Sequence, residues 1–264
     1  MIIAELCQNH NGDMELLQEM VAKAAQSGAH FAKIQTFFAE DLQDGWGDQF
    51  ERMKQNELNF DQHEQFVKWC RKFKIIPMTS VYTTRYAQQL YNCGFEHVKI
   101  GSAQCTDTSL ILSYITAGFK VTISTGGHSE KEIPKLAPLF GVLHCVSQYP
   151  TDEDKADLIR MVKLRKWFPT ANVGLSDHSQ GLKVSKLALT MGAQLVERHF
   201  SLLPREMTKD GVVSINAEEL TDLCRFERLP TTEKLKEEPS FGMIVYPKEE
   251  SEIELIKKYK TRFR

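Results

Sequence analysis

The sequence predicts an α/β protein with a (β/α)₈ TIM-barrel fold from its length, eight short apolar runs and a helical pattern after each run. The chain has 264 residues, and such a barrel typically needs about 250. A doubly wound open sheet is the alternative, but no G-x-G-x-x-G motif follows the first run. The runs, which we expect to be strands, are Ile2–Leu6, Phe31–Gln35, Ile75–Ser80, His97–Ile100, Lys120–Ser124, Gly141–Val146, Asn172–Ser176 and Gln194–Phe200.

The segment after the first run illustrates how each helix is predicted. Asp13 can cap this helix, and Leu17 and Met20 belong to its apolar face. Ser27 and Gly28 can end it. Similar patterns predict helices over Asp61–Lys72, Thr84–Cys93, Thr108–Ala117, Ser129–Ala137, Asp154–Phe168, Gln180–Met191 and Ala217–Glu227.

No linker rich in Pro, Gly or Ser divides the chain, so we expect a single domain over residues 1–264. Its core covers about residues 1–230, and residues 231–264 form an extension in which Pro247 can begin a short amphipathic helix. We expect the basic end of this helix to be solvated, because cations there complement the helix dipole; an anion site is the alternative. The longest connection, Phe38–Phe60, is predicted to be a lid or binding loop, with a mobile insertion as the alternative. The basic residues of the extension's end are Lys257, Lys258, Lys260, Arg262 and Arg264.

Charge and composition exclude several classes of protein. The 33 Lys and Arg residues nearly balance the 35 Asp and Glu residues, so electrostatics alone would hold neither nucleic acid nor an anionic membrane. No signal-peptide pattern is visible, and no apolar run reaches the ~18 residues of a membrane helix, so we expect a cytoplasmic protein. The six cysteines include no C-x-x-C pair and are expected to be reduced, mostly buried thiols.

Polar side chains gather where the predicted strands end, which is where barrel enzymes place their catalytic groups. Lys33 and Lys99 end two of these strands, and hydroxyls such as those of Ser102, Ser124 and Ser176 end or follow others. Two ammonium groups with hydroxyl and amide donors suit a ligand that carries phosphate and carboxylate. The alternative is that each lysine only reaches the solvent at the barrel rim.

Two histidines and a glutamate indicate further chemistry. His178 and His199 end adjacent predicted strands, so they could share one metal ion; the alternative is that each is a hydrogen-bonded core residue. Two nitrogen donors completed by oxygen ligands suit Mn²⁺ or Mg²⁺, with Co²⁺ or Zn²⁺ as substitutes. Glu5 lies inside an apolar strand, where its carboxylate needs compensation. It is either an acid/base group or part of a salt bridge across the barrel.

As an ordered set, the polar motifs of this chain resemble those of the N-acetylneuraminate (sialic acid) synthase family. Any single motif would be weak, but the match runs from residue 2 to about residue 216. The chain departs from the usual family pattern at Thr79-Ser80-Val81-Tyr82 and at Ser147. The matching motifs are Ile3-Ala4-Glu5, Asn9-His10-Asn11-Gly12-Asp13, Ala32-Lys33-Ile34-Gln35-Thr36-Phe37, Lys99-Ile100-Gly101-Ser102, Ser124-Thr125-Gly126, Leu143-His144-Cys145, Tyr149-Pro150-Thr151, Gly174-Leu175-Ser176-Asp177-His178 and Glu197-Arg198-His199-Phe200.

The resemblance implies a metal-dependent condensation of phosphoenolpyruvate with an open-chain amino sugar, typically N-acetylmannosamine. The products would be a sialic-acid-like 2-keto acid and phosphate, and the divalent metal would be Mn²⁺ most often, with Mg²⁺ or Co²⁺ as alternatives. Carried over by motif, Glu5 is the acid/base group, His178 and His199 are the metal ligands, and Tyr149 and Asp210 contact the sugar. The phosphoenolpyruvate set is Lys33, Gln35, Ser80, Lys99, Ser102, Ser124, Ser147 and Ser176.

Several alternatives stay open within this interpretation. Family members commonly carry a C-terminal antifreeze-like domain, and we expect this chain to represent the barrel domain only. A related synthase could use another aldose or a phosphorylated sugar. A non-catalytic barrel could instead act as a binding or regulatory subunit, with a separately encoded antifreeze-like domain as partner. A homodimer is a further expectation of the resemblance.

Overall fold

The computed structural model describes residues 1–43, 47–136, 138–237 and 250–263. Eight parallel strands close into a barrel in sequential order, so the predicted barrel is confirmed and the open sheet is wrong. Each strand begins and ends within two residues of its predicted range. The strands are β1 (Ile2–Glu5), β2 (Phe31–Gln35), β3 (Ile76–Val81), β4 (His97–Ile100), β5 (Lys120–Ser124), β6 (Gly141–Cys145), β7 (Asn172–Asp177) and β8 (Val196–His199).

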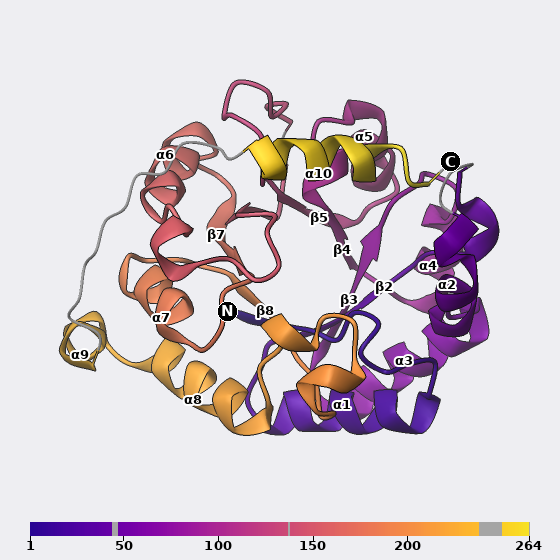
Figure 1. The fold of residues 1–264 in the computed structure, drawn as a ribbon, viewed down its shortest axis with the longest axis horizontal. Coiled ribbons are helices and arrows are strands. Elements are labelled where there is room, and N and C mark those ends of the chain that lie inside the picture. Colours follow the sequence, from indigo (N-terminus) through magenta and orange to yellow (C-terminus); the bar gives the residue numbers. More distant parts are fainter. Residues whose placement is uncertain (44–46, 137, 238–249, 264) are drawn as a thin grey trace.

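Helices surround the barrel (Figure 1). The side chain of Asp13 caps the first helix as predicted, accepting the backbone N–H groups of Glu15 and Leu16. The buried face of that helix includes Leu17 and Met20. In this outer layer lie α1 (Met14–Gln26), α3 (Phe60–Phe73), α4 (Ala87–Cys93), α5 (Thr108–Thr116), α6 (Ile159–Trp167), α7 (Lys183–Thr190) and α8 (Ala217–Arg228).

The helix predicted over Ser129–Ala137 is wrong for residues 129–136, which contain no helix; residue 137 lies outside the described residues. Ser129 and Glu132 do form the contacts that begin many helices, since the Ser129 N–H donates to the Glu132 carboxylate at 2.7 Å. Pro134 then falls in what would be the second turn. There it removes a backbone donor, and its ring would clash with the carbonyl four residues earlier.

The helix predicted over Asp154–Phe168 is interrupted. A 3₁₀ turn over Glu153–Lys155 precedes α6, which begins only at Ile159. Asp157 lies between them with a φ of 41°, a left-handed conformation that a helix cannot contain.

Two layers of apolar side chains stabilise the barrel. The larger layer lies between the strands and the surrounding helices. The smaller one fills the lumen with Ile3, Phe31, Met78, Leu143 and Leu195. Since side chains alternate along a strand, a residue two positions after such a lumen residue also points inward, closer to the carboxyl end of the strands. The lumen is therefore apolar at one level and available to polar groups at the next.

Strand register brings the polar positions of the lumen to a common level. Glu5 of β1 pairs in register with Lys33 of β2 on one side and with His199 of β8 on the other. Ser80 of β3 likewise pairs with Lys99 of β4. The register thus places side chains that are far apart in the sequence around one mouth of the barrel.

Segments outside the βα units lie at this mouth. The connection Phe38–Phe60 contains 3₁₀ turns over Ala39–Asp41 and Gly47–Gln49 and the helix α2 (Phe50–Asn56). Residues 44–46 lie outside the described residues, and the lid role stays a prediction.

Among the described residues after α8 there are two further helices. They are α9 (Thr231–Glu237) and α10 (Glu250–Lys260); the predicted start at Pro247 lies outside the described residues. Figure 1 shows α10 in yellow, on the α5 side of the barrel. Nowhere in the ranges that the structure describes does a helix have the length and apolar character needed to cross a membrane.

Candidate active site

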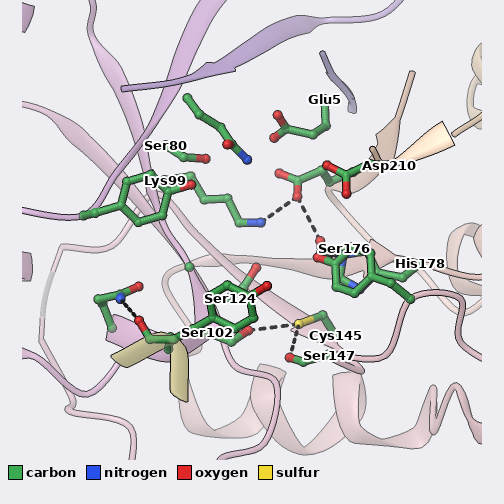
Figure 2. Close-up of a pocket in the computed structure, with 18 of the residues that line it drawn as sticks. Glu5, Ser80, Lys99, Ser102, Ser124, Cys145, Ser147, Ser176, His178 and Asp210 are labelled. Atoms are coloured by element: carbon green, nitrogen blue, oxygen red, sulfur yellow. Dashed lines mark hydrogen bonds and ion pairs between the residues drawn. The ribbon is translucent and has the colours of Figure 1, made fainter. Parts of the chain in front are cut away.

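A pocket of about 500 Å³ opens among the side chains at the carboxyl ends of the strands. Every residue that the sequence predicted for the site lines it, although these residues come from all eight βα units. Figure 2 draws 18 of its lining residues, and the ten that it labels face one space. The predicted residues in its wall are Glu5, Lys33, Gln35, Ser80, Lys99, Ser102, Ser124, Ser147, Tyr149, Ser176, His178, His199 and Asp210.

Glu197 of β8 connects the two lysines of the pocket. Its Oε1 accepts from Lys99 Nζ at 2.6 Å and from the Ser176 hydroxyl at 2.8 Å, while its Oε2 lies 3.4 Å from Lys33 Nζ. Lys33 also donates to the Ser80 hydroxyl at 2.8 Å. The sequence indicated Glu197 only as part of the Glu197-Arg198-His199-Phe200 motif. Its position on the same strand face as His199 was the signal that it also enters the lumen.

Burial and the neighbouring charges shift the pKa values of the lysine and glutamate side chains in this network. Burial lowers the pKa of Lys33 to about 7, against the opposing effect of the Glu197 carboxylate. Burial alone would raise the pKa of Glu197, but the positive charges of Lys33 and Lys99 outweigh it and hold that pKa below its usual range. The carboxylate therefore stays ionised at neutral pH, and Lys33 can hold or release a proton there.

Glu5 lies beside Lys33 on the neighbouring strand. Its Oε2 contacts the Lys33 ammonium group, and its Oε1 accepts the backbone N–H of Cys7 at 2.7 Å. The salt bridge that compensates the buried carboxylate is thus formed with the adjacent strand rather than across the barrel. The same contact places Glu5 next to a group that can exchange protons with it.

Hydroxyl and thiol groups form another side of the pocket. Figure 2 shows Ser102, Ser124 and Ser147 grouped around Cys145. Ser102 Oγ lies 3.0 Å from Cys145 Sγ and accepts the backbone N–H of Gly126 at 3.0 Å. A Cβ atom on Gly126 would lie 2.3 Å from Ser147 Oγ and 2.8 Å from Cys145 Sγ. Glycine at this position therefore keeps open a cradle lined by hydroxyls, which is suited to anionic oxygens.

The two histidines lie together at the other side. Their ring centroids are 5.6 Å apart, and Tyr149 stacks on His178 at 4.0 Å. His178 Nδ1 lies 2.8 Å from the Val146 carbonyl, which can only accept, so this nitrogen carries the hydrogen. His178 Nε2 consequently accepts from the Tyr149 hydroxyl at 2.9 Å. This orientation is typical of a histidine that presents its other nitrogen to a ligand.

Burial keeps both imidazoles neutral, the form that binds metals. It lowers the pKa of His178 to about 3 and that of His199 to about 4. Within the described residues, His199 Nδ1 is buried without a hydrogen-bond partner, and Asp210 Oδ2 lies 3.8 Å from it. A buried nitrogen lone pair that faces a carboxylate fits a divalent cation. These donors thus suit a divalent cation, as the sequence predicted.

Sequence reasoning missed the contribution of the C-terminal segment to this pocket. Ile256, Tyr259 and Phe263 line it together with Arg262, whose exposed fraction is 7%. The expectation that the basic end of α10 is solvated is therefore wrong for Arg262. An antiparallel bridge between Leu42 and Phe263 fixes the backbone there, and Arg262 Nη2 donates to Gln49 Oε1 at 3.1 Å. No local helix-dipole argument could have found these contacts.

The sequence of this chain matches a known protein family and is similar to several synthases. The model of the NeuB family matches residues 20–236. The N-acetylneuraminate-9-phosphate synthase of Drosophila melanogaster is 28% identical over 243 residues, which cover 84% of this chain but 65%, less than two thirds, of that protein. The N,N'-diacetyllegionaminic acid synthase of Legionella pneumophila is 30% identical over 85% of this chain and 70% of its own length.

The fold agrees with these matches. The crystal structure of the N-acetylneuraminic acid synthetase from Leptospira borgpetersenii, in complex with citrate, superposes with a TM-score of 0.82 at 27% identity. The superposition covers 96% of this chain and 90% of that one. The predicted family resemblance is confirmed. The chain belongs to the NeuB family, as a barrel related to synthases of sialic and legionaminic acids.

Proposed function

We propose that this protein condenses phosphoenolpyruvate with an open-chain amino sugar to form a sialic-acid-like 2-keto acid and phosphate. N-acetylmannosamine is the first acceptor to consider, and the diacetamido sugars that lead to legionaminic or pseudaminic acid are the next, since relatives carry those names. The observation that carries the proposal is the pairing of two buried lysines, Lys33 and Lys99, with Glu197 in a pocket rich in hydroxyls.

Phosphoenolpyruvate carries a phosphate and a carboxylate, so its site needs fixed positive charge and hydrogen-bond donors. Lys99 and Lys33 supply the charge, and Glu197 holds both ammonium groups at one side of the pocket. The hydroxyls of Ser102 and Ser147 beside Gly126 supply donors for the remaining oxygens. Lysine suits this role because its ammonium group acts as a point charge with three donors.

The proposed reaction consumes one water molecule. C3 of phosphoenolpyruvate bonds to the aldehyde carbon of the sugar, whose oxygen gains a proton, and water adds at C2 with loss of a proton. The resulting hemiketal phosphate then loses phosphate as its C2–O bond breaks, which leaves the 2-keto group. The pocket walls would hold the two substrates in contact, which supports the bimolecular step.

Glu5 is the group that we assign to proton transfer. Its carboxylate contacts Lys33, whose pKa of about 7 lets it share a proton at neutral pH. The backbone N–H of Cys7 fixes the other carboxylate oxygen at 2.7 Å, so Glu5 keeps one orientation. The Glu5–Lys33 pair would protonate the aldehyde oxygen or accept the proton from water.

The neutral imidazoles of His178 and His199 would hold the divalent cation. When bound there, the cation supplies a Lewis acid for the aldehyde oxygen of the sugar. The hydrogen bond from His178 Nδ1 to the Val146 carbonyl and the proximity of Asp210 to His199 would orient these ligands, and the Tyr149 hydroxyl would have to leave His178 Nε2 for that nitrogen to bind. The sugar-contacting roles of Tyr149 and Asp210 belong to the same proposal.

The test is to incubate the purified protein with phosphoenolpyruvate, a divalent cation and a panel of aldoses, and to measure phosphate release together with the mass of the product. A nine-carbon 2-keto acid from an amino sugar would support the proposal, and the aldose that reacts fastest identifies the acceptor. The Lys120→Ala variant is a matched control, since Lys120 pairs with Glu96 on the surface. Binding of phosphoenolpyruvate without turnover for any aldose would contradict the proposal and favour a binding subunit.

A further inference from the structure

Cys7 is a buried residue beside the pocket that the proposed reaction does not use. It follows β1 directly, and its φ of 49° is a left-handed conformation that favours glycine. A side chain kept in such a conformation commonly marks a functional constraint. Only 2% of Cys7 is exposed, so its thiol contacts protein groups rather than solvent.

The thiol lies among potential metal donors. Cys7 Sγ is 2.8 Å from Asp210 Oδ2 and accepts from Gln35 Nε2 at 3.0 Å. His199 Nδ1 is 3.8 Å from the same oxygen of Asp210. One donor atom from each of Cys7, His199 and Asp210 falls within 4.8 Å of the others. Three separate elements, the end of β1, the end of β8 and the segment after β8, therefore converge on one point.

We propose that Cys7 is a thiolate ligand of the divalent cation, together with His199 and Asp210. Metal–ligand bonds of about 2.0–2.3 Å would span donors at these separations after small adjustments. On binding, the Cys7 S–H bond breaks, the sulfur keeps the electron pair and bonds to the cation, and the proton leaves to solvent. The cation then replaces the thiol proton that now lies between Cys7 and Asp210.

This donor set changes the expected metal. Sequence reasoning with two histidines and oxygen ligands favoured Mn²⁺ or Mg²⁺, which prefer hard oxygen donors. A set of thiolate, imidazole and carboxylate instead favours Zn²⁺, Co²⁺ or Fe²⁺. His178 Nε2 is engaged by Tyr149 at 2.9 Å and would join only if that contact opens. The inference takes the metal's catalytic role from the proposed function, but the binding itself can be measured without turnover.

The test uses Co²⁺ as the probe. Full-length protein, stripped with a chelator and reloaded with Co²⁺, should show a near-ultraviolet thiolate-to-cobalt charge-transfer band, with bound cobalt counted by equilibrium dialysis. The Cys145→Ser variant is the matched control, because Cys145 is also buried in the pocket wall but lies outside the donor group. We expect the control to keep the band and Cys7→Ser to lose it. Affinity for Co²⁺ and Zn²⁺ should fall at least about tenfold in Cys7→Ser.

A second variant separates ligation from folding. Cys7→Gly removes the thiol but suits the left-handed backbone, so it should fold normally by circular dichroism and still lack the band. Cobalt bound without the band in the wild type, a band that persists in both Cys7 variants, or no cobalt binding would each overturn the inference. A cobalt-loaded protein that shows the band but forms no product with any aldose would contradict the proposed function and leave the metal site intact.

Discussion

The ammonium group of Lys99 lies 2.6 Å from Oε1 of Glu197, on the far side of the barrel lumen from the strand that carries the lysine. The same carboxylate contacts Lys33 at 3.4 Å through its other oxygen. One buried anion thus contacts two cations. The Glu5 carboxylate also pairs with Lys33, so an excess of positive charge in the pocket comes from the further lining residues Lys209 and Arg262, against Asp210. An anionic substrate would meet this excess directly.

Removal of Lys99 should weaken the binding of phosphoenolpyruvate more than that of the sugar. A hydrogen bond to a charged group contributes about 1.5–3 kcal/mol, so Lys99→Ala should raise the KM for phosphoenolpyruvate by about 10- to 100-fold. Steady-state kinetics with each substrate varied in turn measures this, with Lys120→Ala as the control. A larger rise in the KM for the sugar would remove Lys99 from the phosphoenolpyruvate side of the pocket.

Loss of the Glu5 carboxylate should slow the reaction without preventing phosphoenolpyruvate from binding. Glu5→Gln keeps the shape and can still contact Lys33, but it cannot exchange a proton. We expect kcat to fall by about 10²- to 10⁴-fold, the usual contribution of a positioned acid/base group. Calorimetry should find phosphoenolpyruvate affinity within a fewfold of the wild type. Unchanged kcat would show that Glu5 only balances the charge of Lys33.

The affinity for phosphoenolpyruvate should decrease as pH rises above about 7. Burial lowers the pKa of Lys33 to about 7, so the lysine is charged below this pH and neutral above it. An anionic ligand favours the charged form, and binding therefore takes up a proton at higher pH. Kd from calorimetry should rise by up to about tenfold per pH unit in this range. A profile that is flat from pH 6 to 9, or unchanged in Lys33→Met, would contradict this assignment.

The fold could be predicted from the sequence because each strand carries its own local signal. Short runs rich in Val, Ile and Phe alternate with helical patterns, and the closed parallel barrel is the arrangement that eight such units favour. The two helix predictions that were wrong failed for local reasons that concern the backbone. Pro134 prevents a helix although Ser129 and Glu132 form a contact typical of a helix start, and the left-handed backbone of Asp157 interrupts the helix predicted over Asp154–Phe168. Neither outcome follows from hydrophobic periodicity.

The candidate site could be predicted as far as strand register determines it. Glu5, Lys33 and His199 meet because neighbouring parallel strands place their ends at one level. The contacts of Cys7 and Arg262 could not be predicted, because they depend on segments that follow no strand period. Cys7 meets a residue of the segment after β8, and Arg262 is placed by the pairing of Phe263 with Leu42.

A methyl group on Gly126 should block the hydroxyl cradle. Its Cβ would lie 2.3 Å from Ser147 Oγ, well inside van der Waals contact, so Gly126→Ala must displace that side chain. Overpacking of this kind costs about 1–3 kcal/mol of folding free energy. We expect a lower Tm and a higher Kd for phosphoenolpyruvate. Gly101→Ala is the control, since its Cβ would meet only Gln104 Oε1 at 3.8 Å; equal effects of the two variants would contradict a specific cradle.

The C-terminal helix α10 forms one side of the pocket, and a single substitution should weaken its packing there without unfolding the barrel. Ile256 is buried on Gly127, and Glu252 accepts the backbone N–H of Ser147 at 2.9 Å. Ile256→Ala removes apolar contacts worth about 2 kcal/mol or more in a packed site. Because α10 lies outside the βα units that form the barrel, this loss should appear as faster hydrogen exchange over residues 250–263 and a higher KM for the sugar, with little change in global stability.

Lys257→Ala is the matched control for that experiment, because the lysine is exposed on the same helix. Hydrogen exchange followed by mass spectrometry localises the effect, and denaturant unfolding measures global stability separately. A mere packing role on the barrel surface would leave the KM values unchanged while exchange accelerates. Since Tyr259 lies in α10 and Arg262 and Phe263 follow it directly, we expect both quantities to change together.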